Sequence, residues 1–480
     1  MEAKRLAGLE PADVFGYFEE ICSIPHGSRN TKQISDYLVN FAREQGLRYI
    51  QDDADNVIIF GDATPGYEDH PPVILQGHMD MVCEQDDDCT IDMTKDGLDV
   101  THDGNMVFAK GTTLGADNGI AVAMGMAILA DKTIPHPPIE LLITSDEEIG
   151  LLGAAAVDLS ELKGKILINL DSEGEGILTV SCAGGCVANI SLPVERRAVY
   201  GPCIRLVVND LKSGHSGADI HQNRANANKV MGEFMSRIQK LMPLCLTSLV
   251  GGTKDNVIPE SCQATLVAMG INLERINDIA EQLQAEIREK YDEPNATVQA
   301  FDVDALGGNS LSTESTAKVI SLLCAAPHGV QAWSEDIEGL VQTSLNMAVV
   351  KLGDRLNMTL SVRSSVNSEK REVLDQLKKL AEMFDASYEE DGAYPAWEFK
   401  KESHLRDVMV STYKDLFGKE PKVEAIHAGL ECGLFTEKIP GLDCVSVGPE
   451  MHDIHTIRER LESGSTQRTW KFLQAVLKNL

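Results

Sequence analysis

The sequence predicts an α/β protein in which a mixed sheet is covered by helices on both faces and a separate α+β domain is inserted into the chain. Three observations support this fold class. Helical patterns and short apolar runs alternate over residues 1–185, give way to strand, strand, helix patterns over residues 186–395, and return over residues 396–480. We therefore expect residues 1–185 and 396–480 to form one discontinuous domain. Residues 186–395 form the insert, which we expect to consist of two related halves.

The first domain is predicted to contain an early helix followed by buried strands. Over residues 31–45, Ile34, Leu38, Phe41 and Ala42 recur at helical spacing and form one apolar stripe. Short apolar runs then predict strands, each followed by a polar or glycine-containing segment. These strands span residues 57–60, 73–75, 139–143 and 166–170.

The insert is predicted to contain two rounds of strands and helices. The first round comprises a helix over 223–242, strands near 246 and 262, and a helix over 273–291. The second round comprises a helix near 315–325, strands near 344 and 358, and a helix over 368–384. After Pro395, strands over 423–426 and 444–447 and a final helix from Thr466 would complete the sheet of the first domain.

Composition excludes several classes of protein. The chain of 480 residues is 43% hydrophobic, which is enough for a large core, and its formal net charge of −31 disfavours nucleic acid and anionic membrane surfaces as partners. The first residues lack the apolar core of a signal peptide, and no apolar run approaches the roughly 18 residues that span a bilayer. We therefore expect a cytoplasmic protein whose eleven cysteines, which form no CxxC pair, are reduced.

Two predicted strands end in residues that can bind metal. In QGHMDMV, residues 76–82, His78 and Asp80 are two positions apart and project to the same side of a strand. One of them can bind a metal while the other orients it, although such a pair also arises by chance. In INLDSEGEG, residues 168–176, an apolar strand ends in the carboxylate of Asp171.

A third strand end carries adjacent acids. TSDEEIG, residues 144–150, follows the strand over 139–143 at the position where open α/β sheets place their active sites. A solvated acidic loop is the alternative, but adjacent carboxylates repel one another unless a cation lies nearby. With a metal present, one of Glu147 and Glu148 could act as general base and the other as ligand.

Two further segments supply an acid and histidines. In GTTLGADNGIAVAMGMAILA, residues 111–130, Asp117 stands at the start of a helix, where it could also be an ordinary helix cap. MHDIHTIRER, residues 451–460, offers both His452 and His455, and their spacing does not choose between them.

Taken together, these motifs resemble those of the zinc aminopeptidase and dipeptidase group, which has a dinuclear site and an inserted lid domain. The motifs that carry the resemblance span the chain: QGHMDMV, GTTLGADNGIA, TSDEEIG, NLDSEGEG, SGHSGADI, HAGLECGLF and a closing segment that contains His-Thr. Within that group, the aminoacyl-histidine dipeptidases are the most similar branch. The closing segment departs from the family pattern, because Thr456, Ile457 and Arg458 follow the histidine, although Glu459 is retained.

The resemblance implies a division of labour around two zinc ions, for which manganese or cobalt could substitute. It implies Asp117 as the bridging ligand, His78 and Asp171 on one ion, and Glu148 and His455 on the other. Glu147 would be the general base and Asp80 the acid that orients His78. The resemblance also implies a cis peptide bond between Asp117 and Asn118.

The resemblance also implies substrate-binding residues in the insert and near the chain's return from it. His215, in SGHSGADI, would stabilise the oxyanion, and Arg363 would hold the substrate carboxylate with its planar guanidinium. HAGLECGLF, residues 427–435, would contribute backbone N–H groups around Gly429. From the residues alone, each of these roles has an ordinary structural alternative. His215 could be a core or loop histidine, Arg363 could form a surface ion pair, and HAGLECGLF could be an ordinary helix start.

The expected function is metal-dependent hydrolysis of dipeptides, including those that end in histidine such as β-alanyl-histidine. A hydroxide that bridges the metals would attack the peptide bond with the help of Glu147 as base. The alternatives are a related amidohydrolase, either an N-acyl amino acid deacylase or a tripeptidase, and a catalytically silent metal-binding scaffold. The expected partner is a small peptide substrate, and the resemblance suggests a homodimer.

Overall fold

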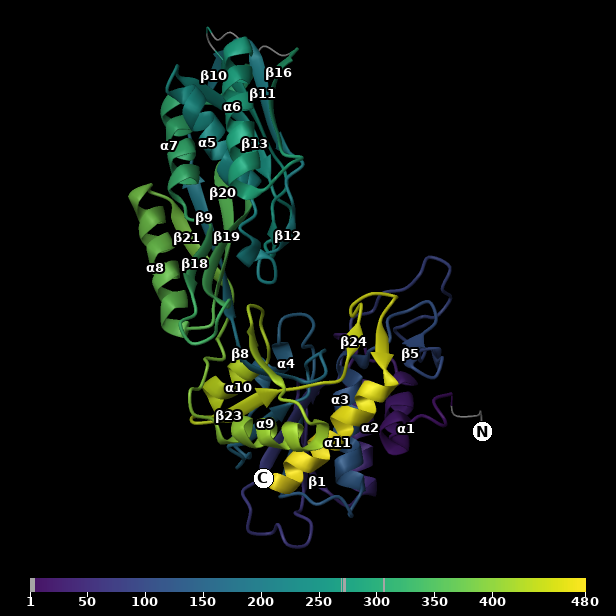
Figure 1. The fold of residues 1–480 in the computed structure, drawn as a ribbon. Coiled ribbons are helices and arrows are strands. Elements are labelled where there is room, and N and C mark those ends of the chain that lie inside the picture. Colours follow the sequence, from purple (N-terminus) through teal and green to yellow (C-terminus); the bar gives the residue numbers. More distant parts are fainter. Residues whose placement is uncertain (1–4, 269, 271–272, 305–306) are drawn as a thin grey trace. The chain divides into compact units, whose positions relative to one another are not determined.

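The computed structural model describes residues 5–268, 270, 273–304 and 307–480, and the chain divides into two compact units (Figure 1). Unit 1 comprises Met1–Ser181, Phe399–Ala425 and Leu430–Leu480. Unit 2 comprises Cys182–Glu398 and Ile426–Gly429. Within the described ranges, no helix has both the length and the apolarity needed to cross a membrane.

An eight-stranded mixed sheet forms the centre of unit 1. Its strand order is β1 (Arg48–Gln51), β2 (Val57–Gly61), β6 (Ile139–Thr144), β3 (Val73–His78), β7 (Ile166–Asn169), β23 (Asp443–Ser446), β8 (Ile177–Cys182) and β22 (Lys422–Ile426). Strand β3 is parallel to β6 and β7, and β7 is parallel to β23, whereas β2 runs antiparallel to β1 and β6, and β8 runs antiparallel to β23. The residues of β3, β6 and β23 are buried at every position, so both faces of the sheet are covered there.

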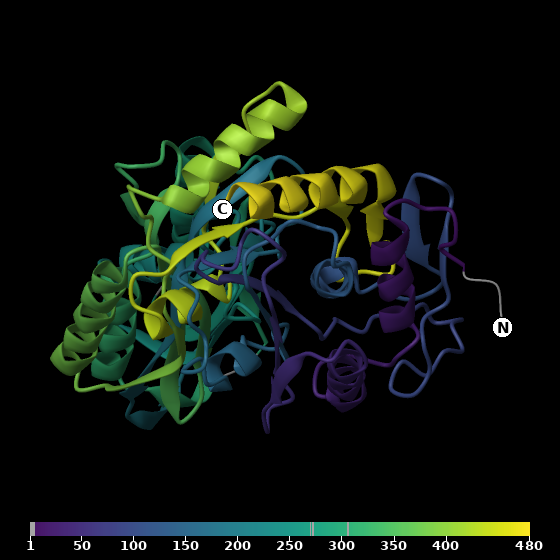
Figure 2. The ribbon, with the colours of Figure 1, turned by 90° about the horizontal axis from the view of Figure 1, so that it is seen from below.

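Helices and a small second sheet complete unit 1. The helices are α1 (Ala12–Cys22), α2 (Lys32–Glu44), α3 (Ala116–Ala130), α4 (Leu152–Ala156), α9 (His404–Phe417), α10 (Cys432–Lys438) and α11 (Ser463–Asn479). Helix α3 packs on β3 and β6, and Figure 2 shows α1 beside it. A four-stranded sheet in the order β24 (Met451–His452), β25 (Arg460–Glu462), β5 (Met106–Ala109) and β4 (Val100–His102) joins the closing segment to an early hairpin.

Unit 2 contains a nine-stranded sheet. Its main path is β16 (Thr297–Val303), β11 (Cys203–Asn209), β15 (Cys262–Ala268), β13 (Leu244–Gly251), β19 (Val341–Leu352), β20 (Arg355–Ser364), β9 (Gly184–Pro193) and β21 (Ser387–Tyr394), and β18 (Gly329–Trp333) pairs with β19. The helices are α5 (Ala227–Gln239), α6 (Leu273–Tyr291), α7 (Thr313–Ala325) and α8 (Asn367–Met383). Two small pairs, β10 (Arg196–Tyr200) with β17 (Gly307–Leu311) and β12 (Gly214–His215) with β14 (Val257–Ile258), complete it. Apolar faces of the helices and of the large sheet share one core, which includes Phe234, Leu266 and Leu345.

The predicted fold class is confirmed, and most predicted elements are present with shifted ends. The helix predicted over 273–291 has those bounds as α6, whereas the helix predicted over 223–242 is shorter and forms α5. It begins later because Asn223 adopts a left-handed conformation after a short 3-10 turn, and because the side chain of Asn226 caps α5 by accepting from two backbone N–H groups.

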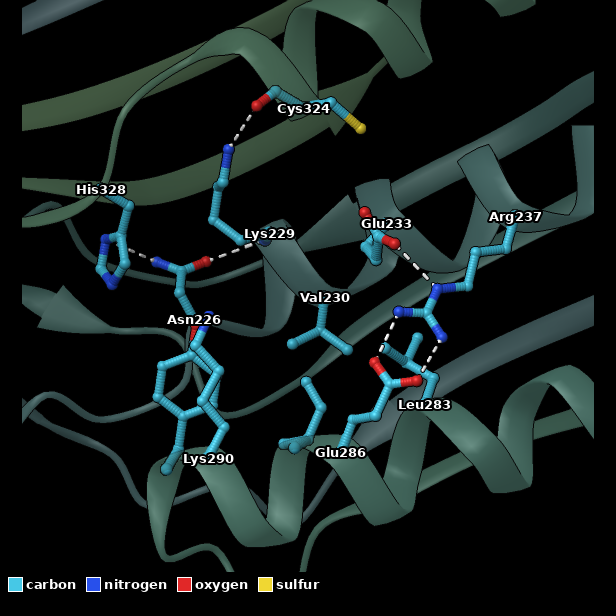
Figure 3. A pocket seen from close by; sticks show the side chains of 12 residues that line it. Asn226, Lys229, Val230, Glu233, Arg237, Leu283, Glu286, Lys290, Cys324 and His328 are labelled. Carbon is cyan, nitrogen blue, oxygen red and sulfur yellow. Dashed lines mark hydrogen bonds and ion pairs between the residues drawn. The ribbon is translucent and has the colours of Figure 1, made fainter. Parts of the chain in front are cut away.

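A cavity of about 400 Å³ lies between α5, α6 and the end of α7 in unit 2 (Figure 3). Its charged groups are paired with protein groups. Lys229 donates to the carbonyls of Leu323, Cys324 and Ala326, and Arg237 pairs with Glu233 and Glu286. Lys229 thus satisfies carbonyls at the end of α7, and Arg237 links α5 to α6 through its ion pair with Glu286.

His328, at the wall of this cavity, is held in its neutral form. Its Nδ1 accepts from the side-chain amide of Asn226 at 3.3 Å and lies 3.4 Å from the backbone nitrogen of Met347, so the proton is on Nε2. Burial, helped by the charge of Lys229, lowers the pKa of His328 from 6.5 to about 4.

We expect His328 to make unit 2 sensitive to acid. Between pH 6.5 and about 4 the imidazole of His328 binds a proton in the unfolded state but not in the folded state. The free energy of unfolding therefore decreases as the pH falls through this range. Urea unfolding of His328→Gln should show a smaller loss of stability over this range than the wild type. The exposed control His221→Gln should behave as the wild type; an unchanged pH dependence in His328→Gln would refute the assignment.

Candidate metal centre

Strand ends bring most of the predicted ligands together in unit 1. His78 is the last residue of β3, Asp171 follows β7, and Glu147 and Glu148 follow β6. Because these three strands are parallel neighbours, their carboxyl ends lie at one edge of the sheet. Asp117 reaches the same edge from the start of α3, where its backbone departs from helical geometry and the peptide bond to Asn118 is cis, as expected.

One group of side chains surrounds one oxygen of Asp117. Nε2 of His78 lies 3.3 Å from Oδ1 of Asp117 and 3.5 Å from Oδ1 of Asp171. His78 is 1% exposed, and Asp171 is largely buried. One imidazole and two carboxylates therefore converge within a small, protected volume.

A second group surrounds the other oxygen of Asp117. Nε2 of His455 lies 3.1 Å from Oδ2 of Asp117 and 2.9 Å from Oε1 of Glu148. The carboxylate of Asp117 is thus shared by two groups, one on each oxygen. His455 comes from the closing segment, and the structure brings it rather than His452 to this cluster; His452 instead lies 4.0 Å from Glu450.

The spacing of these atoms suits metal ions. Ligands bound at about 2.0 to 2.1 Å to a tetrahedral zinc lie roughly 3.3 Å from one another, which is close to the distances in both groups. Oε1 of Glu148 is buried and accepts no hydrogen bond from the described residues, although Nε2 of His455 lies 2.9 Å away, as expected of an atom whose lone pair faces a cation. The two groups are close together, because ligand atoms of His78, from the first group, of Glu148, from the second, and of the shared Asp117 all lie within 4.8 Å of one another.

Electrostatics at the cluster show how strongly it attracts positive charge. Burial would lower the pKa of His78, but Asp171 and Asp117 outweigh burial and raise it well above its ordinary value. The carboxylates of Asp117, which is hydrogen-bonded to His455, and of Glu148, which lies 2.9 Å away, raise the pKa of His455 to about 10. Burial raises the pKa of Asp171 to about 8 and that of Glu147 well above its ordinary value. Divalent cations would compensate these acids in the same way as the protons do.

Asp80 connects the metal cluster to the acidic loop. Its carboxylate accepts from the backbone N–H of Glu147 at 2.9 Å and from the hydroxyl of Ser28 at 2.8 Å. Nδ1 of His78 lies 3.0 Å from the backbone carbonyl of Asp80 and 3.5 Å from its carboxylate. The main chain of Asp80 is therefore the nearer acceptor for His78, and its side chain mainly fixes the loop that carries Glu147.

Two residues to which sequence reasoning gave no role, Asn118 and Glu431, form hydrogen bonds with the segments that carry the cluster. The side chain of Asn118 accepts from the backbone N–H of His78 at 3.2 Å and donates to the carbonyl of Leu170 at 2.9 Å, and so ties three ligand segments together. Glu431, which is fully buried, accepts from Gln76 and from Thr144. Both residues lie within the quoted motifs, but only their tertiary partners reveal these roles.

The predicted substrate-binding residues form a cluster of their own in unit 2. Nδ1 of His215 lies within hydrogen-bonding distance of the backbone nitrogens of Gly217 and Ala218, so its proton is on Nε2, which can donate to another group. Burial, helped by the charge of Arg363, lowers the pKa of His215. Its imidazole is therefore a neutral donor.

Arg363 and Gly429 share a neighbour in Tyr394. Arg363 donates to the hydroxyl of Tyr394 at 3.0 Å, and its buried Nε has no hydrogen-bond partner. A Cβ at Gly429 would lie 2.8 Å from the Tyr394 ring, so only glycine fits there without a shift. His427, which sequence reasoning also did not assign, lies 2.7 Å through its Nε2 from the hydroxyl of Ser344, the residue that pairs with Arg363 between β19 and β20.

Comparison with known proteins supports the resemblance to the peptidase group over nearly the whole chain. Residues 74–479 match the family model described as Peptidase family M20/M25/M40. The chain is 36% identical over 480 residues to the cytosol non-specific dipeptidase of Escherichia coli (strain K12), with 99% of each chain covered.

Solved structures give the same result. The aminoacylhistidine dipeptidase from Vibrio alginolyticus superposes with a TM-score of 0.92 at 36% identity, covering 98% of this chain and 97% of that one. Aminopeptidase PepT from Bacillus cereus shares the fold, with a TM-score of 0.58 at 16% identity and coverage of 98% and 99%. The chain therefore belongs to the peptidase family M20/M25/M40.

Proposed function

We propose that this protein hydrolyses the peptide bond of dipeptides, including those that end in histidine such as β-alanyl-histidine, with two zinc ions. The observation that carries the proposal is the carboxylate of Asp117, each oxygen of which faces a separate group of one imidazole and one further carboxylate. Membership of a peptidase family and similarity to two proteins named as dipeptidases support the reaction and the substrate class.

In this proposal the two groups are the two ligand sets. Asp117 is the shared ligand, His78 and Asp171 hold one ion, and Glu148 and His455 hold the other. Zinc suits this set of imidazole and carboxylate donors, and manganese or cobalt could replace it. The ions would polarise the scissile carbonyl and acidify water.

Glu147 is proposed as the general base. Burial raises its pKa well above the ordinary value, which makes it a stronger proton acceptor when it is ionised. It would take the proton of the attacking water and deliver it to the leaving amine. Asp80 acts through its hydrogen bond to the Glu147 backbone, which fixes the loop that carries this base.

Unit 2 supplies the proposed substrate-binding residues. Arg363 would hold the substrate carboxylate, because its guanidinium offers paired donors and its Nε has no hydrogen-bond partner among the residues that the structure describes. His215 would donate to the oxyanion from Nε2, and backbone N–H groups near Gly429 would also bind the substrate. We further propose a cytoplasmic protein, in line with the relative named as a cytosol dipeptidase, that assembles as a homodimer.

A substrate panel tests the proposed reaction. The full-length protein is assayed on β-alanyl-histidine, other dipeptides, a tripeptide and an N-acetyl amino acid, before and after chelation and after zinc is returned. We expect dipeptide hydrolysis that chelation abolishes and zinc restores. Failure to cleave any dipeptide would overturn the proposal, and preference for the tripeptide or the N-acetyl amino acid would favour the related amidohydrolases.

Replacing Glu147 with Gln should separate metal binding from turnover. The variant keeps the size of the side chain but cannot accept a proton, so kcat should fall about 10²- to 10⁴-fold while metal content stays at the wild-type level. Elemental analysis and steady-state kinetics measure both. Glu437→Gln, an exposed control on α10, should keep wild-type activity; normal turnover in Glu147→Gln would mean that another group is the base.

In the Arg363→Met variant, the protein should lose its preference for substrates that have a free C-terminal carboxylate. We expect KM for a dipeptide to rise about tenfold or more, because a charge-assisted hydrogen bond contributes roughly 1.5 to 3 kcal/mol. The preference of the wild type for a dipeptide over its C-terminal amide should largely disappear in the variant. The exposed Arg355→Met, on the same strand, is the control; an unchanged preference in Arg363→Met would rule out this role.

A further inference from the structure

Glu459 is a buried carboxylate that binds the turn leading to Asp117. It is 3% exposed and lies four residues after His455, directly before β25. Its Oε2 accepts from the backbone N–H groups of Leu114 at 2.7 Å and Gly115 at 3.0 Å. Its Oε1 accepts from Ala116 at 2.8 Å and lies 3.4 Å from the backbone nitrogen of Asp117.

The turn depends on an acceptor at this position. Gly115 adopts the left-handed conformation, with φ of 69°, and the four successive N–H groups from Leu114 to Asp117 all point toward one carboxylate. Leu114, Gly115 and Ala116 are buried, so water does not readily replace the acceptor. A buried N–H group that loses its partner costs about 1 to 3 kcal/mol, and a charged acceptor for several such groups forms strong hydrogen bonds.

Glu459 is also linked directly to the other ligand segment. The backbone N–H of Glu459 donates to the carbonyl of Thr456 at 3.0 Å, and the hydroxyl of Thr456 donates to the carbonyl of Asp453 at 2.7 Å. His455 lies inside this short hydrogen-bonded turn. A single side chain thus joins the turn that carries His455 to the turn that carries Asp117, which are more than 300 residues apart in the sequence.

We infer that Glu459 is the positioning residue of the metal centre, which sets Asp117 relative to His455 before any metal binds. The inference rests on the proposed function, because it takes Asp117 as the shared ligand. Since both ions would use Asp117, misplacing its backbone should weaken the binding of both. Groups that orient metal ligands typically contribute 10- to 100-fold to metal affinity.

A matched pair of substitutions tests this role. Glu459→Gln removes the charge and turns an NH₂ group toward backbone N–H donors. Glu140→Gln is the control, because Glu140 is 4% exposed and accepts from the backbone N–H groups of Lys163 and Gly164 at the opposite end of β6 from the acidic loop. Both variants lose a buried carboxylate that binds several amides, but only one of these carboxylates faces the Asp117 turn.

Zinc affinity is measured on the full chain by competition with a chromophoric chelator at fixed pH, and stability by urea unfolding of the metal-free protein. We expect both variants to lose stability and only Glu459→Gln to lose zinc affinity, by about tenfold or more for both ions. If Glu459→Gln does not fold, Glu459→Asp, which keeps the charge but is one methylene shorter, takes its place with the same expectation.

Three results would overturn the inference in distinguishable ways. Wild-type affinity in the folded Glu459 variant would show that Asp117 is positioned without it. An equal loss of affinity in Glu140→Gln would show that general destabilisation, rather than positioning, weakens the site. A wild-type chain that binds no zinc would overturn the proposed function itself.

Discussion

Repulsion between buried carboxylates is the constraint on which this centre depends. Asp117, Glu147, Glu148 and Asp171 crowd the same edge of the sheet, and carboxylates placed this close cannot all be ionised unless positive charge lies among them. The raised pKa values of His78 and His455 reflect this need for positive charge, because the nearby carboxylates favour the charged forms of both imidazoles. In the proposed function two divalent cations meet the same demand, and the neutral imidazoles become ligands.

The scaffold resists that repulsion with hydrogen bonds from the backbone. Parallel strands β3, β6 and β7 place the ligand-bearing loops side by side, and Asn118 connects the backbone at His78 to the backbone before Asp171. Asp80 holds the amide of Glu147, and Glu459 holds the turn before Asp117. Each of these side chains uses a polar group to fix the main chain of another residue, so the ligands are fixed through their backbones.

Sequence patterns predicted the parts of the fold that local chemistry determines. Helix α6 carries a regular apolar stripe, and its ends coincide with the pattern, whereas the start of α5 was placed four residues early because the Asn226 cap and the preceding 3-10 turn leave no periodic signal. The apolar runs located β3, β6 and β7, and the polar residues after them share one sheet edge because these three strands are parallel neighbours. The domain boundaries and the roles of the site residues stay predictions.

Long-range partners account for most of what the sequence could not show. His452 and His455 are equivalent as sequence letters, and only the turn around Thr456 brings His455 beside Asp117. Glu459 was noticed only as a retained acid, because its partners lie more than 340 residues earlier in the chain. The nearer contact of His78 with the carbonyl of Asp80, rather than its carboxylate, likewise depends on backbone geometry that no spacing rule contains.

Anomalous diffraction from zinc-containing crystals of the wild-type chain tests the central claim most directly. The account predicts two zinc peaks, one on each side of the Asp117 carboxylate, with His78 and Asp171 next to one and Glu148 and His455 next to the other. A single peak, or zinc bound away from Asp117, would contradict it.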